Sequence, residues 1–438
     1  MERRDSRRDA VMNQSLREQS TAPLRPGYVR YVLLLIFLVA IFNTGDRTIL
    51  SVLVDDIKAE LGLDDRQMGF VLGFAFSLAH MLLGIPLARL ADRVSRRSVV
   101  ALSLFGWSAM TALMGTAQNF AQLALTRAGV GIGEAGGSPA CHALIASHVP
   151  PARRARAMAL LSIGALAGLG LGASYGAWAS AQFGWRLALI GAGAPGVLLA
   201  LLFWCTVRDG ESLSAAAPES LGVILRQLWR SPGFVWLTAA ATFATMTSMG
   251  RMLWEPALLR RVFLIEQGQL GTWYFAVSVL PSALGAWLGA TLVDRLAAAD
   301  RRWYAWLPAL AAVALVPLAA LFYLWPEQHR VAGVPVAFVF CIGMSLLGAI
   351  WGPATMTLAQ VIVPERGRAV GAATWTMIAN FIGYGVGAML VGDLSIRFGA
   401  VFGTDGLRYA LLVLASLSLL TAWLFHKLAL ALRCAPSR

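Results

Sequence analysis

The chain has 438 residues, of which 58% are hydrophobic and 13% charged, and its net charge is +13. Soluble domains usually contain about 25% charged residues, whereas a helix that crosses a bilayer needs about 20 mostly apolar ones. The composition therefore excludes a large soluble domain and leaves room for about twelve membrane spans. The apolar runs are continuous rather than alternating, which argues against a transmembrane β-barrel.

Apolar runs and the polar residues that interrupt them predict two sets of six helices. The first six spans are expected near residues 28–54, 67–89, 98–118, 120–148, 157–181 and 185–207. The second six are expected near residues 233–262, 269–293, 303–325, 334–362, 369–396 and 407–430. The predicted fold class is an all-α integral membrane protein with twelve transmembrane helices in two six-helix bundles.

A long polar stretch, residues 208–232, is predicted to link the two sets of helices. The expected organisation is a cytoplasmic tail over 1–27, an N-terminal bundle over 28–207, this linker, and a C-terminal bundle over 233–432. Within the linker, residues 221–230 (LGVILRQLWR) have the pattern of a short amphipathic helix at a membrane surface.

Basic residues gather on one side of this topology. With both termini on the same side, 25 of the 36 Lys and Arg residues fall in segments on that side. The opposite side receives eight: Lys58, Arg66, Arg186, Arg260, Arg261, Arg330, Arg397 and Arg408. Because cytoplasmic loops are enriched in Lys and Arg, we expect both termini to be cytoplasmic. The bias towards arginine is typical of GC-rich bacterial genomes, so the expected location is a bacterial inner membrane.

The basic charge is thereby explained without a nucleic-acid partner. The four cysteines, Cys141, Cys205, Cys341 and Cys434, have no CxxC spacing. They predict neither a disulfide nor a metal site, and we expect no cofactor.

The two halves share short motifs in the same order. Three pairs of segments match: 90–93 (LADR) with 292–295 (LVDR), 154–157 (RARA) with 366–369 (RGRA), and 138–140 (SPA) with 352–354 (GPA). Their offsets are all slightly above 200 residues, which indicates a duplicated six-helix unit.

The loop after the second span, residues 88–97 (ARLADRVSRR), resembles the signature of the major facilitator superfamily. The family has glycine where this chain has Ala88 and Ser95. The resemblance implies two bundles that alternate between access states. Asp92 is expected at a helix end, where it can accept hydrogen bonds from a neighbouring helix N-terminus or an arginine. Asp92 and Arg93 are therefore the predicted gating residues.

Charged residues inside the spans narrow the resemblance. The first span carries residues 43–47 (NTGDR), the fourth carries Arg127 and Glu134, and the seventh carries Arg251. This set resembles the spinster family, whose animal members move lysophospholipids and sphingosine phosphate. The resemblance implies proton-coupled transport of a lipid-like amphiphile.

Ionised side chains at bilayer depth cost at least about 2.5–3.5 kcal/mol each, so they persist where they are paired or line a wet cavity. We predict Asp46 and Glu134 as proton-coupling residues and Arg47, Arg127 and Arg251 as substrate-binding residues. Neighbours on a helix point about 100° apart, so Asp46 and Arg47 cannot both face a cavity squarely. Arg127 and Glu134 are seven residues apart on one face, and we expect them to pair while the cavity is empty. The structural alternative is that these charges are buried ion pairs that fix helix packing.

The predicted function is therefore proton-coupled secondary transport, by alternating access, of an amphiphilic, lipid-like or organic-anion substrate. The expected partners are that substrate, for example a lysolipid, together with protons and membrane lipids, and the chain is expected to act as a monomer and not as an enzyme. Two alternatives remain. One is a multidrug or organic-anion efflux transporter of the same fold. The other is a lipid scramblase without coupling, or a membrane sensor.

Overall fold

The computed structural model describes residues 26–91, 95–209, 221–363 and 368–432, and these residues are almost entirely helical. The elements of the first half are α2 (Pro26–Val52), α3 (Val54–Leu61), α4 (Asp65–Gly69), the π-helical η1 (Phe70–Ala75), α5 (Phe76–Ala91), α6 (Arg96–Met114), α7 (Phe120–His148) and α8 (Pro151–Thr206).

The second half begins with a short helix and contains the only hairpin in the described ranges. Its elements are α9 (Leu221–Arg230), α10 (Pro232–Arg261), α11 (Gln267–Tyr274), η2 (Phe275–Val279), α12 (Leu280–Ala297), α13 (Trp303–Leu324), β1 (Arg330–Val331), β2 (Val334–Pro335), α14 (Ala337–Leu347), α15 (Trp351–Ile362), α16 (Arg368–Ile378), η4 (Ala379–Val386), α17 (Gly387–Phe402), η5 (Gly403–Asp405), α18 (Gly406–Ser416) and α19 (Ser418–Ala431). Strands β1 and β2 pair antiparallel, with Arg330 opposite Pro335.

Eight continuous helical segments are long and apolar enough to cross a membrane. Two of them, 152–206 and 370–431, hold two spans each. In the first, Gly184 has φ 80° and ψ 160°, a conformation that glycine adopts readily and that turns the chain between spans. The charge-bearing helices α7 and α10, with 29 and 30 residues, complete the set. The described residues thus have the predicted twelve spans.

We number the spans in chain order. In the first half they are α2, α4–η1–α5, α6, α7 and the two parts of α8 on either side of Gly184. In the second half they are α10, α11–η2–α12, α13, α14–α15, α16–η4–α17 and α18–α19. The amphipathic segment 221–230 is helix α9, whose Ile224 and Leu228 pack into the core of the second half while Trp229 is exposed.

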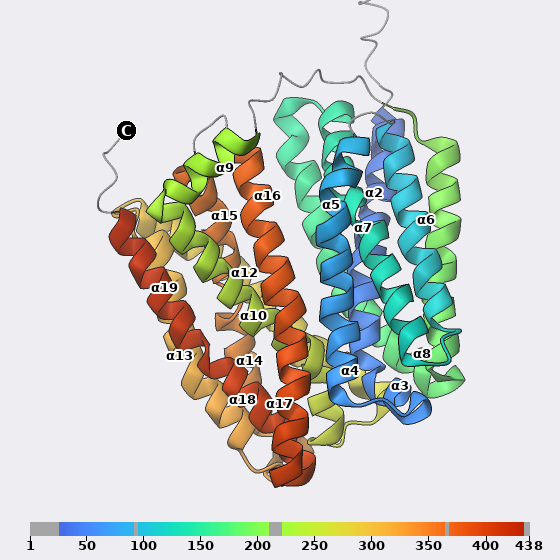
Figure 1. Cartoon of the computed structure of the whole chain (residues 1–438), viewed down its shortest axis with the longest axis vertical. Coiled ribbons are helices and arrows are strands. Elements are labelled where there is room, and N and C mark those ends of the chain that lie inside the picture. Colours follow the sequence, from blue (N-terminus) through green and yellow to red (C-terminus); the bar gives the residue numbers. More distant parts are fainter. Residues whose placement is uncertain (1–25, 92–94, 210–220, 364–367, 433–438) are drawn as a thin grey trace, which may run out of the picture.

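The two halves form a V (Figure 1). The bundles diverge toward the end that carries α9, which we call the linker face, and converge at the end that carries α3, which we call the far face. Within the described residues, the hydrogen bonds between halves lie at the far face, apart from one deeper bond between Arg127 and Tyr384.

Close helix crossings between the halves depend on small residues. A Cβ added at Gly73 of span 2 would lie 2.8 Å from the Tyr384 carbonyl oxygen of span 11. One added at Gly271 of span 8 would lie 2.4 Å from the Ala173 carbonyl oxygen of span 5. Glycine therefore lets these two pairs of backbones touch, as small residues generally do between membrane helices.

The π-helical segments lie in these crossing spans. Segment η1 is in span 2, η2 in span 8 and η4 in span 11. An extra residue in a helical turn weakens the regular hydrogen-bond ladder, and such turns are frequent at functional sites. Three of the four spans at these two crossings thus have locally widened turns, and span 5 does not.

Ion pairs close the far face. Asp65 accepts hydrogen bonds from Arg261 at 2.7 and 3.0 Å and from Ser395 at 2.7 Å, and it also pairs with Lys58. Arg260 donates to Asp56 at 2.6 Å. Because Asp56 and Asp65 belong to the first half and their arginine partners to the second, these bonds hold the two halves together at this end.

Almost all of the eight basic residues that the sequence predicts at the far face form ion pairs. Seven form ion pairs: Lys58, Arg66, Arg186, Arg260, Arg261, Arg397 and Arg408. The eighth, Arg330, donates to the Phe263 carbonyl oxygen at 3.0 Å. Hydrogen bonds from Arg186, and then from Trp185, lower the pKa of Glu60 on α3. Positive charge on the far face is therefore largely neutralised.

The substitution Asp65→Asn tests this contact. An amide cannot form the ion pairs with Lys58 and Arg261, and a hydrogen bond to a charged group contributes about 1.5–3 kcal/mol. We expect the population with an open far face to rise roughly tenfold or more. Spin-label distances across the far face measure it. Glu327→Gln is the matched control, because Glu327 pairs with Arg408 within one half; equal distance distributions for both variants would refute the role of Asp65.

Candidate functional site

In the first half, the central ion pair joins spans 1 and 4. Arg47 donates to Glu134 Oε2 through both Nε, at 2.9 Å, and Nη2. The Glu134 side chain is fully buried, whereas the Arg47 side chain is 27% exposed to solvent. The expectation that Arg127 pairs with Glu134 is wrong for this conformation, because Arg47 reaches the carboxylate from the neighbouring helix.

Arg127 instead contacts the other half of the protein. It is buried, and its Nη2 donates to the Tyr384 hydroxyl of span 11 at 3.3 Å. Arg47 and Arg127 both lie over the Phe76 ring, at 4.8 and 4.7 Å from its centroid. The negative face of an aromatic ring attracts cations, so Phe76 helps to hold two guanidinium groups close together.

Two polar atoms at this centre make no hydrogen bond to any described residue. They are Arg127 Nε and Glu134 Oε1, and both are buried. Buried polar atoms are nearly always hydrogen-bonded in folded proteins. Arg127 Nε and Glu134 Oε1 are therefore an unsatisfied donor and an unsatisfied acceptor at this centre.

Asp46 faces a different direction from its neighbour Arg47, as the helix geometry requires. It is buried in the first half, and Thr111 of span 3 donates to its Oδ2 at 3.1 Å. It also borders a side pocket of about 250 Å³ between spans 1, 5 and 6, next to Tyr175 and Pro195. The structure thus does not bring Asp46 into direct contact with the Arg47–Glu134 pair.

In the second half, Arg251 and Glu255 pair on consecutive turns of span 7. Arg251 also donates to the Ser345 hydroxyl of span 10 at 3.2 Å. Glu255 is fully buried and accepts from Ser278 at 2.6 Å and from Cys341 at 2.9 Å. Each half therefore contains one arginine–glutamate pair whose glutamate is fully buried.

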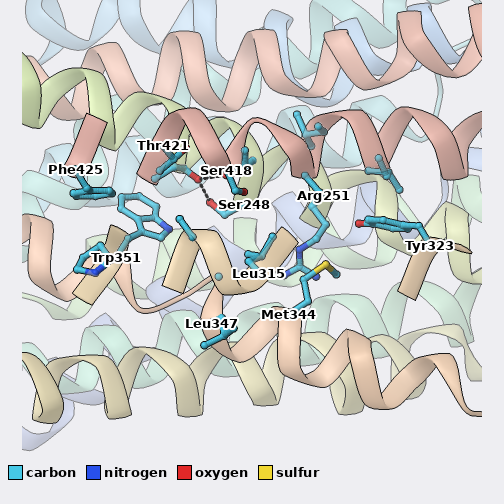
Figure 2. A pocket seen from close by; sticks show the side chains of 18 residues that line it. Ser248, Arg251, Leu315, Tyr323, Met344, Leu347, Trp351, Ser418, Thr421 and Phe425 are labelled. Carbon is cyan, nitrogen blue, oxygen red and sulfur yellow. Dashed lines mark hydrogen bonds between the residues drawn. The ribbon is translucent and has the colours of Figure 1, made fainter. Parts of the chain in front are cut away.

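Arg251 borders two pockets. The central pocket, about 230 Å³, lies between spans 7, 8 and 10 and reaches Leu169 of span 5 in the other half. The second, the C-half pocket, lies between spans 7, 9, 10 and 12 and measures about 40 Å³, which is room for a few water molecules. In Figure 2, Arg251 and Tyr323 lie toward one end of this pocket and Trp351 and Phe425 toward the other.

The middle of the C-half pocket carries hydroxyl groups. Ser248, Ser418 and Thr421 lie between its two ends in Figure 2. Most of the remaining lining is apolar, including Leu315 and Met344. The C-half pocket thus has a charged end, hydroxyl groups in the middle and apolar walls.

Sequence reasoning missed the partners of these charges. Tyr384, Phe76, Thr111, Ser345 and Cys341 carry no charge and have no motif spacing that would single them out. Their roles follow only from helices that meet in space. The predicted gating residues Asp92 and Arg93 lie outside the residues that the structure describes.

The fold and the charged centre define a class of protein: an integral membrane protein of two six-helix halves, each with a buried ion pair inside it. The family profile of the Major Facilitator Superfamily matches residues 36–388. The chain belongs to the major facilitator superfamily.

Several relatives have functional names. An "MFS-type efflux pump" of Mycolicibacterium smegmatis is 33% identical over 382 residues, covering 86% of this chain and 87% of the relative. Human "Protein spinster homolog 1" is 26% identical over 86% of this chain and 75% of its own length. The relatives are transporters, and the resemblance to spinster proteins is confirmed.

Solved structures give the same result. A bacterial homologue of the human lysosomal transporter spinster, in an inward-facing and unoccupied conformation, superposes with a TM-score of 0.82. It is 25% identical, and the match covers 94% of this chain and all of the other.

The Arg47–Glu134 pair makes a prediction about stability. Removing one member of a buried pair leaves an uncompensated charge and typically costs about 3–5 kcal/mol, whereas removing both costs much less. We therefore expect Arg47→Met to lower the thermal unfolding temperature more than the double variant Arg47→Met/Glu134→Gln. Unfolding in detergent measures the difference. If the double variant loses at least as much stability as the single one, the pair is not coupled.

Proposed function

We propose that the protein is a proton-coupled secondary transporter, not an enzyme, that moves an amphiphilic anion by alternating access. The observation that carries the proposal is the arrangement of charge: each half presents one buried arginine–glutamate pair toward the interior. A charged pair inside a membrane bundle is costly unless it serves a pathway or a proton relay. Support comes also from a relative named as an efflux pump and from the solved homologue of a lysosomal transporter.

The orientation follows from charge. The linker face carries the excess of basic residues, and cytoplasmic segments are enriched in them. We place this face, with both termini, in the cytoplasm, and the protein in a bacterial inner membrane. The V of Figure 1 is then the inward-open state, with the far-face ion pairs closing the opposite side.

Arg47, Arg127 and Arg251 are the substrate-binding residues in this proposal. A guanidinium group offers a planar fork of donors that matches phosphate or carboxylate. Arg127 Nε has no partner among the described residues, and Arg251 borders both pockets of the second half. An anionic head group that bridges arginines from both halves would draw the halves together, and the apolar walls would receive its tail.

Asp46 and Glu134 are the proposed proton carriers. Glu134 has a free acceptor atom beside Arg47, and Asp46 is held by a neutral donor, Thr111. An anionic head group that binds Arg47 displaces Glu134 from it. The buried Glu134 carboxylate then has no cation beside it and takes up a proton. Asp92 and Arg93 are proposed to gate the linker face. We propose that the chain works as a monomer with substrate, protons and membrane lipids as its partners.

A second candidate is drug efflux, and the name of the relative from Mycolicibacterium smegmatis favours it. Flux into proteoliposomes separates the possibilities. A lysophospholipid and a drug cation are supplied in parallel, with and without a pH gradient. Gradient-driven movement of the lysophospholipid alone supports the proposal; movement of the cation alone supports efflux. Lipid movement that ignores the gradient indicates a scramblase.

Proton coupling is tested by Asp46→Asn and Glu134→Gln. Each substitution removes a titratable group while keeping its shape, so we expect a folded protein that loses flux driven by the pH gradient. Exchange of labelled substrate without a gradient checks that binding survives. Wild-type rates of gradient-driven flux in both variants would exclude these residues as proton carriers.

Head-group recognition is tested by Arg251→Lys and Arg251→Ala. Lysine keeps the charge but loses the fork, so binding of a lysophospholipid should weaken while binding of the matching neutral monoacylglycerol should not. Arg251→Ala should weaken anion binding further, by roughly 1.5–3 kcal/mol. Titrations with both ligands measure this, and an equal loss for both would make Arg251 a structural residue.

A further inference from the structure

Glu255 is enclosed at the centre of the second half. Its exposed fraction is 0%, and three helices supply its partners: Arg251 from span 7, Ser278 from span 8 and Cys341 from span 10. Arg251 binds Oε2, whereas Ser278 and Cys341 both donate to Oε1. Because Glu255 forms an ion pair with Arg251, the site holds one negative and one positive charge.

The other titratable groups facing this pair are neutral hydroxyl and thiol groups. They come from span 8 as Tyr274, from span 9 as Tyr323 and from span 10 as Cys341. Among the described residues, Arg251 is the only cation that pairs with Glu255. The neutrality of this centre therefore depends on one guanidinium group.

Of the two charged groups of this centre, the guanidinium is the one that borders a pocket. Arg251 lines both the central pocket and the C-half pocket, whereas Glu255 lines neither. Glu255 lies behind Arg251 as seen from these spaces. An anion that takes the donors of Arg251 competes directly with the carboxylate for them.

The consequence is electrostatic. If Arg251 turns to an anionic ligand, Glu255 remains as an isolated charge in a site closed to water, which is very costly. A buried carboxylate in that position takes up a proton instead. The Arg251–ligand pair and the neutral carboxylic acid then again sum to zero charge.

We propose that Glu255 is a third proton-coupling residue, located in the second half: binding of an anion at Arg251 is accompanied by uptake of one proton at Glu255. The proton converts the carboxylate to the acid and leaves when the anion departs and Arg251 returns. The inference rests on the proposed function, and it adds a proton site that is independent of Asp46 and Glu134. Ser278 and Cys341 act as positioning residues that keep the carboxyl group in place.

The test is proton linkage in the purified full chain. The probe is lysophosphatidylglycerol, whose phosphodiester does not titrate near neutral pH. Calorimetric titrations in buffers of different ionisation enthalpy give the number of protons taken up per bound ligand. We expect Glu255→Gln to take up one proton fewer than the wild type. For each pH unit, the ligand affinity of the variant should therefore change tenfold less than the affinity of the wild type.

Glu327→Gln is the matched control, because it makes the same chemical change at the far face and should leave the proton count unchanged. Glu255→Asp keeps a carboxyl group and should retain the proton. If Glu255→Gln is folded and takes up as many protons as the wild type, the inference is overturned while the proposed function stands. If the wild type binds no lysophosphatidylglycerol, or binds it without proton uptake, the proposed function fails, and this inference fails with it.

Discussion

The rest of the structure depends on the cost of placing ionised side chains in an apolar bundle. Removing the partner of a buried charge typically costs about 3–5 kcal/mol, so helices that carry charges must meet helices that carry their partners. Span 4 meets span 1 where Arg47 binds Glu134, and spans 8 and 10 meet span 7 where Glu255 is held. In the proposed mechanism, a charged ligand competes for the arginines of these same pairs.

Contacts between the halves are of two kinds. At the far face, ion pairs join the bundles. Partly exposed pairs such as Arg260–Asp56 contribute little when solvated, whereas the bonds of the buried Asp65 contribute more. Deeper in the protein, glycines such as Gly73 and Gly271 let backbones touch. Ion pairs at one end, beside helix crossings made of small residues, suit two bundles that must separate at that end. The bond from Arg127 to Tyr384 joins the two halves at the charged centre itself.

The architecture was predictable because it follows from length and hydrophobicity. Runs of about 20 apolar residues can only be spans, and the repeated motifs indicated two equal halves. The observed helix boundaries differ from the predicted ones by a few residues. The fifth and sixth spans, which were predicted to be joined by a short loop, turn instead at the single residue Gly184. The π-helical turns were not predictable, because they arise where spans 2, 8 and 11 cross the other half.

The sequence alone determined which charges lie within the membrane spans, because an intramembrane charge stands out in any apolar run. It also determined that Asp46 and Arg47 diverge, since adjacent residues on a helix always do. Only the tertiary structure decided the partners. The spacing along one helix predicted an ion pair between Arg127 and Glu134. Where the helices cross, Glu134 instead pairs with Arg47, and Arg127 donates a hydrogen bond to Tyr384. The periodicity of a sequence describes one helix at a time. Which charged residues pair depends on how two helices are rotated and at what depth in the membrane they lie relative to each other.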